Sequence, residues 1–262
     1  MRVATWNMKQ VAPRQPIENR WQWIEDVINP DVVVLTEATL PTTGVPAGWS
    51  AIWTEGGVGK RRRWGTIIAG RDVELVPVTD RKGLLRRRPL DFYWPAVVQV
   101  AEVRSGGQHW GVVVGMYGIT MDLDDNSVGH GRLSMPVLLD SVAPIVKGAE
   151  NVVLAGDFNV WPVDKPRELE RMGLVDVVEM TASDRSQLSG CSGCGMGAAC
   201  GHMWTHRNGT SPNAAVQNLD YIFTDRGLAS RVTSVSGGIA DFPTSWEFSD
   251  HAPVVADFSQ RG

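Results

Sequence analysis

The chain has 262 residues, a net charge of -4 and a pI near 5.7, with 43% hydrophobic and 21% charged residues. That is the composition of an ordinary globular protein, and the length suits one large α/β domain. Its longest apolar runs are too short to cross a bilayer, and the first residues do not form a secretory signal. We therefore expect a cytoplasmic protein that makes no membrane contact.

In chain order, the hydrophobic pattern predicts short strands alternating with a few helices. Residues 3–6 are expected to form a strand, residues 18–28 a helix closed by Pro30, and residues 31–37 a buried strand. Further strands are expected at residues 66–70, 97–103, 110–117, 151–155, 221–223, 232–235 and 254–258. Helices are expected at 131–147, with Pro136 and Pro144 limiting its ends, and at 165–172. This order indicates an α/β domain with stacked sheets.

Polar side chains stand at or beside the ends of five of these strands. The segments are Thr5-Trp6-Asn7, Leu35-Thr36-Glu37, Gly156-Asp157-Phe158-Asn159, Asn218-Leu219-Asp220-Tyr221 and Ser249-Asp250-His251. Each of them alone is typical of a turn. Together they predict one sheet edge where polar groups converge. Oxygen donors such as those of Asn7, Glu37 and Asp250 suit Mg²⁺ or Mn²⁺. These ions activate a water molecule for attack on a phosphoester.

In order and local sequence, the five segments resemble the endonuclease/exonuclease/phosphatase superfamily, which has the DNase-I-like fold. The resemblance spans residues 3–258, and its most specific parts are Gly-Asp-Phe-Asn at 156–159 and Ser-Asp-His at 249–251. It implies a four-layer α/β sandwich, in which two packed mixed β-sheets are flanked by helices. It also implies a single domain over residues 1–262 and a divalent-metal-dependent phosphodiesterase.

The resemblance also implies a role for each strand-end residue. Asn7, Glu37 and Asp250 match the family's ligands for Mg²⁺ or Mn²⁺. Asp157 matches the carboxylate that orients or deprotonates the attacking water and contacts a second metal. Asn159 matches the amide that holds the phosphate or the water.

Three further residues match groups that handle the phosphoryl oxygen. His251 matches the imidazole that contacts this oxygen, and Asp220 matches its orienting carboxylate, which favours a cationic imidazole. Tyr117 matches a phosphate donor of the abasic-site and exonuclease-like branch, although a tyrosine at the edge of the core is equally consistent with the pattern. Gly118-Ile119-Thr120 follows it, where that branch has Pro and Asn nearby. The departure leaves abasic-site activity open.

A basic stretch favours a nucleic-acid substrate, which makes a nuclease acting on DNA or RNA our leading interpretation. Its runs Arg61-Arg62-Arg63 and Arg86-Arg87-Arg88 lie beside aromatic residues, a combination suited to phosphate contact and base stacking. Two solvated loops are the alternative. The rival functions are hydrolysis of a small or lipid phosphate, such as a phosphoinositide or sphingomyelin, and nucleic-acid binding without catalysis. No obligate protein partner is evident.

A Gly- and Cys-rich insertion at about residues 186–210 has the spacing of a structural zinc site. It contains Cys191 and Cys194 in a C-x-x-C pair, followed by Cys200, with His202 or His206 to complete the set. Free thiols and a redox pair are the alternatives. We expect a zinc-pinned loop to present Trp204 and Arg207 to substrate.

Overall fold

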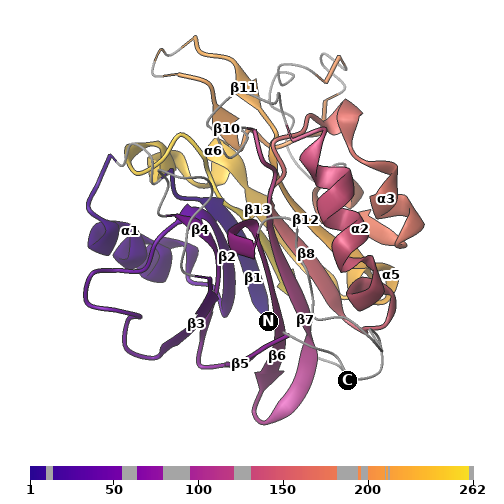
Figure 1. Ribbon diagram of the computed structural model, residues 1–262. Coiled ribbons are helices and arrows are strands. Elements are labelled where there is room, and N and C mark those ends of the chain that lie inside the picture. Colours follow the sequence, from indigo (N-terminus) through magenta and orange to yellow (C-terminus); the bar gives the residue numbers. More distant parts are fainter. Residues whose placement is uncertain are drawn as a thin grey trace.

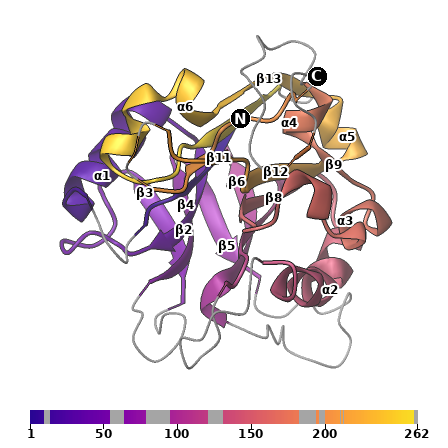
Figure 2. The same cartoon turned by 90° about the horizontal axis from the view of Figure 1, so that it is seen from above.

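The computed structural model describes residues 1–9, 14–54, 64–78, 95–120, 131–181, 194–195, 200–209, 211 and 213–259. Two mixed six-stranded sheets pack against each other, and helices cover their outer faces. Figure 2 shows α1 and α6 on one side of the strands and α2 to α5 on the other. This is the predicted four-layer α/β sandwich. No helix among the described residues is long and apolar enough to span a membrane.

The first sheet has the strand order β13-β14-β1-β2-β4-β3. Only its central pair, β1 with β2, is parallel, and the other neighbours are antiparallel. The strands are β1 (Arg2–Asn7), β2 (Val32–Ala38), β3 (Trp49–Trp53), β4 (Gly65–Arg71), β13 (Val232–Gly237) and β14 (Val254–Phe258).

The second sheet repeats this design in the order β5-β6-β7-β8-β12-β9, with β7 and β8 as its parallel pair. Its strands are β5 (Glu74–Pro77), β6 (Val98–Ser105), β7 (Gln108–Tyr117), β8 (Val152–Asp157), β9 (Leu174–Asp176) and β12 (Asp220–Asp225). A separate two-stranded ribbon of β10 (His206–Arg207) and β11 (Val216–Gln217) stands at the top of Figure 1.

Most helices are short. They are α1 (Ile17–Trp23) with its π-helical continuation η1 (Ile24–Ile28), α2 (Ser134–Lys147), α3 (Arg167–Arg171), α4 (Val177–Met180), α5 (Arg226–Ala229), α6 (Gly238–Asp241), and the 3-10 turns η2 (Pro95–Val97), η3 (Pro162–Asp164) and η6 (Pro243–Glu247). One expectation was wrong: Pro144 lies inside α2 rather than at its end. A proline there removes one backbone donor, but α2 buries six apolar side chains along its length, which maintains the helix across the defect.

The sheets meet through β-branched and small side chains such as Val34, Ile68, Val153 and Ile222, all fully buried. The approach is closest at Gly115 on β7, where an added Cβ would lie 3.0 Å from Val34 Cγ1 and 2.9 Å from Thr66 Cγ2. Each such buried aliphatic side chain contributes about 1.5–3 kcal/mol by leaving water. The core therefore fixes the two parallel strand pairs against each other, and with them whatever follows their carboxyl ends.

Candidate active site

The parallel pairs of the two sheets deliver their final residues to one place. In register, Asn7 at the end of β1 lies beside Thr36 on β2, and Tyr117 at the end of β7 lies beside Asp157 on β8. Two hydrogen bonds then connect the sheets. Asn7 Nδ2 donates to Asp157 Oδ2 at 2.8 Å, and Tyr117 Oη donates to Glu37 Oε1 at 3.0 Å.

The backbone is strained where it presents these groups. Glu37, Asn159 and Lys9 have positive φ angles of 43°, 50° and 49°. Glu37 also lies at an irregularity in the pairing of β2 with β4, where the register shifts between Leu35 and Ala38. Such conformations cost about 1–3 kcal/mol each and gather at functional sites, where a bulge can redirect a side chain.

Asp157 is an almost completely buried carboxylate of the site, with 1% of its surface exposed. Its Oδ2 accepts from Asn7 and, at 3.1 Å, from Asn159 Nδ2, while its Oδ1 accepts from Asn159 N at 2.9 Å. Burial and the neighbouring Asp220 raise the pKa of Asp157, His251 and the hydrogen bonds oppose the shift, and the net result is a pKa of about 8. A carboxyl group with a pKa near neutrality is suited to exchange protons at physiological pH.

Asn159 serves first to position Asp157. Its Nδ2 has two protons, and it donates to Gly118 O at 2.9 Å as well as to Asp157. Because both partners belong to the protein, the amide locks the strand end after β8 rather than pointing a donor outward.

His251 and Asp220 form a buried ion pair on the other side of Asp157. His251 Nδ1 lies 2.8 Å from Asp220 Oδ2, and its Nε2 lies 3.9 Å from Asp157 Oδ2. Burial lowers the pKa of His251, but Asp220, Asp157 and Asp250 outweigh it and raise the value to about 10. The imidazole is therefore a cation at neutral pH, with Nε2 as the donor facing Asp157.

The His251 backbone is anchored to the first sheet. Trp6 Nε1 donates to His251 O at 2.9 Å, and Ser249 Oγ donates to Asn7 O at 2.8 Å while accepting from His251 N at 3.0 Å. The segment at 249–251 thus moves as one unit with the end of β1.

Glu37 and Tyr117 complete the cluster. Burial raises the pKa of Glu37, an effect that His251, Tyr117 and Asn7 oppose. The pKa of Tyr117 is raised well above its ordinary value by burial and by the neighbouring Glu37 and Asp157 carboxylates, so its hydroxyl remains a donor. Trp64 packs edge-on against the Tyr117 ring at 5.1 Å and holds it in place.

The donor set fits a hard divalent cation. Glu37 and Asp157 are carboxylates whose pKa values are raised, chiefly by desolvation, which means that the nearby His251 cation does not fully balance their ionised forms. A metal cation beside them would supply the remaining counter-charge. Asn7 Oδ1 accepts from Lys9 N at 2.8 Å and keeps a second lone pair for a metal. All are oxygen donors, as Mg²⁺ and Mn²⁺ prefer.

Asp250, expected as a metal ligand, has two cationic or imidazole neighbours that sequence reasoning missed. Lys9 Nζ donates to Asp250 Oδ2, and His206 Nε2 lies 3.9 Å from the same oxygen. Burial raises the pKa of Asp250, but His251 and Lys9 outweigh it and lower the value, which keeps the carboxylate ionised. The only sequence signal for Lys9 was its place two residues after Asn7.

His206 belongs to this site and not to the cysteine loop. It forms a β-bridge with His251, their rings lie 4.5 Å apart, and His206 Nδ1 is 2.9 Å from Gln217 Oε1. Burial and the His251 cation lower its pKa to about 4, so the ring is neutral. Among the described residues, two sets of potential metal donors therefore share His251: His206 with Asp250, and Asp157 with Asp220.

Some of the remaining predicted residues have described contacts, and the others lie outside the described part of the chain. Arg207 donates its backbone N–H to Asp250 O at 3.0 Å, and its guanidinium stacks 3.9 Å from the Trp246 ring centre. Trp204 packs against Cys194 and Cys200. The two arginine runs, Arg61–Arg63 and Arg86–Arg88, and Cys191 lie outside the described residues.

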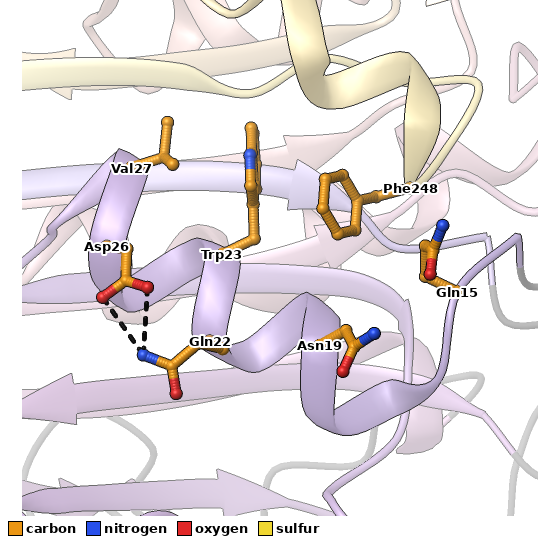
Figure 3. Close-up of a pocket in the computed structure, with 7 residues that line it drawn as sticks. All are labelled: Gln15, Asn19, Gln22, Trp23, Asp26, Val27 and Phe248. Atoms are coloured by element: carbon orange, nitrogen blue, oxygen red, sulfur yellow. Dashed lines mark hydrogen bonds between the residues drawn. The ribbon is translucent and has the colours of Figure 1, made fainter.

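A shallow hollow of about 320 Å³ lies apart from this cluster, between α1 and the end of η6. Figure 3 shows Trp23 and Phe248 along its wall and Gln22 donating to Asp26 at its rim. The hollow is lined mainly by amide and aromatic side chains and has one acidic residue, Asp26. The converging carboxylates of the strand ends are not part of its lining.

The chain matches the model of the Endonuclease/Exonuclease/phosphatase family over residues 4–251. It belongs to that family. The enzyme is accordingly a hydrolase of phosphoester bonds, from a family that uses divalent metal ions. No curated protein matches the chain significantly.

Three solved structures share its fold at low sequence identity. A 3′ phosphatase from Neisseria, bound to a product DNA hairpin, is 19% identical with a TM-score of 0.61, over 99% of this chain and 100% of that one. An AP endonuclease from Archaeoglobus fulgidus is 17% identical with a TM-score of 0.63, over 99% and 100% of the two chains. An AP endonuclease from Leishmania major is 14% identical with a TM-score of 0.65, over 99% and 88%. They support the DNase-I-like fold.

Proposed function

We propose that this enzyme is a Mg²⁺- or Mn²⁺-dependent nuclease that hydrolyses phosphodiester bonds of DNA or RNA. The observation that carries the proposal is the convergence of Asp157, the Asp220–His251 pair and the Glu37–Asn7 oxygen donors at the strand ends of both sheets. This arrangement supports a base, an acid and oxygen donors for a cation side by side, which is what hydrolysis of an anionic diester requires.

His251 and Asp157 divide the proton chemistry. With pKa values of about 10 and about 8, the imidazolium holds its proton while the carboxyl group exchanges its own near neutrality. His251 Nε2 donates a hydrogen bond to a phosphoryl oxygen, and Asp157 accepts a proton from the attacking water. Asp220 keeps the imidazole charged and orients it through Nδ1.

The other residues hold the phosphate and the cation. Tyr117 Oη, protonated because its pKa is raised, donates to a phosphate oxygen once substrate displaces its contact with Glu37. Glu37, Asn7 and Asp250 would hold Mg²⁺ or Mn²⁺, and Asp157 would be available to a second ion. A bound divalent cation would neutralise phosphate charge and lower the pKa of the attacking water.

The basic stretch supports a polymeric substrate over a small phosphoester. Arg61–Arg63 directly precede Trp64 in the chain, and Trp64 contacts Tyr117 within the site. Arginine side chains are suited to contact the backbone phosphates of a nucleic acid. The solved structure of the Neisseria 3′ phosphatase holds a DNA hairpin, in agreement with this proposal.

A substrate panel tests the proposal. Single-stranded, duplex and abasic DNA, RNA, bis(p-nitrophenyl) phosphate and a phosphate monoester are incubated with the enzyme in Mg²⁺, Mn²⁺ or EDTA. We expect cleavage of at least one nucleic acid that EDTA abolishes. Cleavage of the monoester alone would overturn the nuclease assignment, and no cleavage of any substrate would overturn the catalytic one.

Two matched variants accompany the panel. Asp157→Asn removes the proposed base, whereas Asp26→Asn makes the same isosteric change at an exposed position on the rim of the hollow in Figure 3. The first is expected to lose cleavage and the second to retain it.

A further inference from the structure

A second cluster of donor atoms lies in the insertion, away from the oxygen donors of the strand ends. Cys194 Sγ, Cys200 Sγ and one ring nitrogen of His202 all lie within 4.8 Å of one another. Both cysteines are buried, with 3% and 2% of their surface exposed. We propose that this cluster binds a structural Zn²⁺ ion, which fixes the segment that braces the Asp220–His251 pair.

The geometry and the donor types both favour zinc. Cys200 Sγ and His202 Nδ1 are 3.3 Å apart. A sulfur 2.3 Å and a nitrogen about 2.0 Å from one tetrahedral ion would lie about 3.5 Å apart, so the pair needs almost no movement. Thiolate and imidazole donors select Zn²⁺, whereas Mg²⁺ and Mn²⁺ favour the oxygen donors of the strand ends. The chain therefore separates two metals by their chemistry.

Charged side chains border the proposed site. Glu179 on α4 lies close enough to His202 for the two side chains to interact electrostatically. Lys165 Nζ holds Asp176 and Glu179 at 3.0 Å and 2.6 Å.

The three described donors leave one position of a tetrahedral ion for a further ligand. Cys191 stands three residues before Cys194 and forms a C-x-x-C pair with it in the sequence, but it lies outside the described residues.

The ion would reach the active site through the chain that follows it. Three residues after His202, Thr205 Oγ1 accepts from Asp220 N at 3.1 Å, and Thr205 O accepts from Ala252 N at 2.7 Å. His206 then bridges to His251, and Arg207 N donates to Asp250 O at 3.0 Å. Trp204, packed on both cysteines, connects the cluster to this strip. The backbone of Asp220 and of residues 250–252 is therefore held by a segment whose start would be pinned by zinc.

The test begins with metal analysis of the purified full chain, after exposure to Mg²⁺ and removal of loosely bound ions. We expect about one equivalent of zinc per chain, whichever phosphoester the enzyme cleaves. Cobalt substitution should give the near-ultraviolet charge-transfer band of thiolate-bound Co²⁺. Absence of zinc from protein prepared under reducing conditions in zinc-supplemented medium, or a disulfide between Cys191 and Cys194 in that protein, would overturn the proposal.

Variants separate a zinc ligand from a packing residue. His202→Ala, Cys194→Ser and Cys200→Ser should each lower the zinc content at least tenfold after dialysis against a competing chelator. His202→Cys should retain zinc, because a thiolate can replace the imidazole. His109→Ala changes an exposed histidine on β7 and should also retain it.

Hydrogen exchange tests the link to the active site without an activity assay and without relying on variants that fold poorly. Zinc is stripped from wild-type protein with a thiol-reactive mercurial and then restored with excess thiol and zinc. Amides of Thr205, Arg207 and Ala252 should exchange at least tenfold faster in the stripped protein and recover on restoration. Unchanged exchange at all three would show that zinc does not brace the strip.

Discussion

The strand-end site and the cysteine cluster are built in opposite ways. Asn7, Tyr117 and Asp157 occupy the last positions of strands whose register is set by two long sheets, and hydrogen bonds join them across the sheets. Cys194, Cys200 and His202 lie outside the helices and strands of the described residues, in the part of the chain that precedes β10. The first site is positioned by the fold, and the second depends on what its own side chains bind.

The difference shows in the charge balance of the two places. At the strand ends the fold holds several carboxylates in spite of desolvation, as the raised pKa values of Glu37 and Asp157 record. Such groups reduce stability and persist because surrounding structure enforces them. We therefore expect changes at the strand ends to alter activity with little loss of fold, and changes at the cluster to alter local order.

Asp157→Asn is expected to have the largest effect, a loss of cleavage rate of about 10⁴-fold, because it removes the proposed base. The fold should be unharmed. Since burial raises the pKa of Asp157 to about 8, the folded state loses stability as the pH rises from about 4 to about 8, and the full cost of the ionised carboxylate remains above pH 8. That cost disappears in the amide. Single-turnover kinetics and thermal unfolding in EDTA measure both quantities. If Asp157→Asn had a lower melting temperature than the wild type at pH 7 and kept full activity, Asp157 would be a structural residue and not the base.

Asp220→Asn should have a smaller effect, a rate loss of about 100-fold. The amide preserves the shape of the side chain but no longer stabilises the His251 imidazolium across the 2.8 Å contact. The pKa of His251, followed by NMR, should fall from its raised value. An unchanged imidazole pKa would mean that Asp220 does not act through His251.

These two variants also show how far sequence alone could lead. The order of strands and the segments ending in Asn7, Asp157 and His251 were predictable, because buried strands leave an apolar pattern and the family motifs mark their ends. The edge strands β3, β5 and β9 were missed because they are short or half exposed, which weakens that pattern.

Contacts between distant segments could not be predicted from sequence. Lys9 and His206 meet at Asp250 from segments nearly 200 residues apart, and no local pattern marks either one. The sequence also left His202 and His206 equivalent as partners of the cysteines. The β-bridge between His206 and His251 and the approach of His206 to Asp250 place His206 at the strand-end site.

Lys9→Met should have a smaller effect, on the apparent affinity for Mg²⁺, and it tests whether Asp250 is a metal ligand. The Lys9 ammonium occupies Asp250 Oδ2, so a cation at this carboxylate must compete with it. Removing a charge at this distance should tighten the apparent affinity for Mg²⁺ by about tenfold. The Mg²⁺ dependence of the cleavage rate measures this. Weaker Mg²⁺ binding would indicate that Lys9 supports the metal site instead.

The smallest effect is expected for Lys165→Met, beside the cysteine cluster. Lys165 is paired with Asp176 and Glu179, and its side chain is 18% exposed. The variant should lose about 1 kcal/mol of stability at pH 7. Burial lowers the pKa of Lys165, but the two carboxylates outweigh it and raise the value. The stabilisation is therefore present below about pH 10 and is lost as the pH rises through the raised pKa. Urea titrations at pH 7 and pH 11 test the difference, and an equal loss at both values would count against it.

The central claim is that Glu37 and its neighbours form a divalent-metal site that drives phosphodiester hydrolysis. The most direct measurement is the cleavage rate of metal-free enzyme titrated with Mg²⁺ and Mn²⁺, for wild type and for Glu37→Gln, on the best substrate of the panel. We predict no cleavage without metal, full recovery in the wild type, and a large increase in the Mg²⁺ concentration that Glu37→Gln requires. Full-rate cleavage by the metal-free enzyme, or identical titrations for the two proteins, would contradict it.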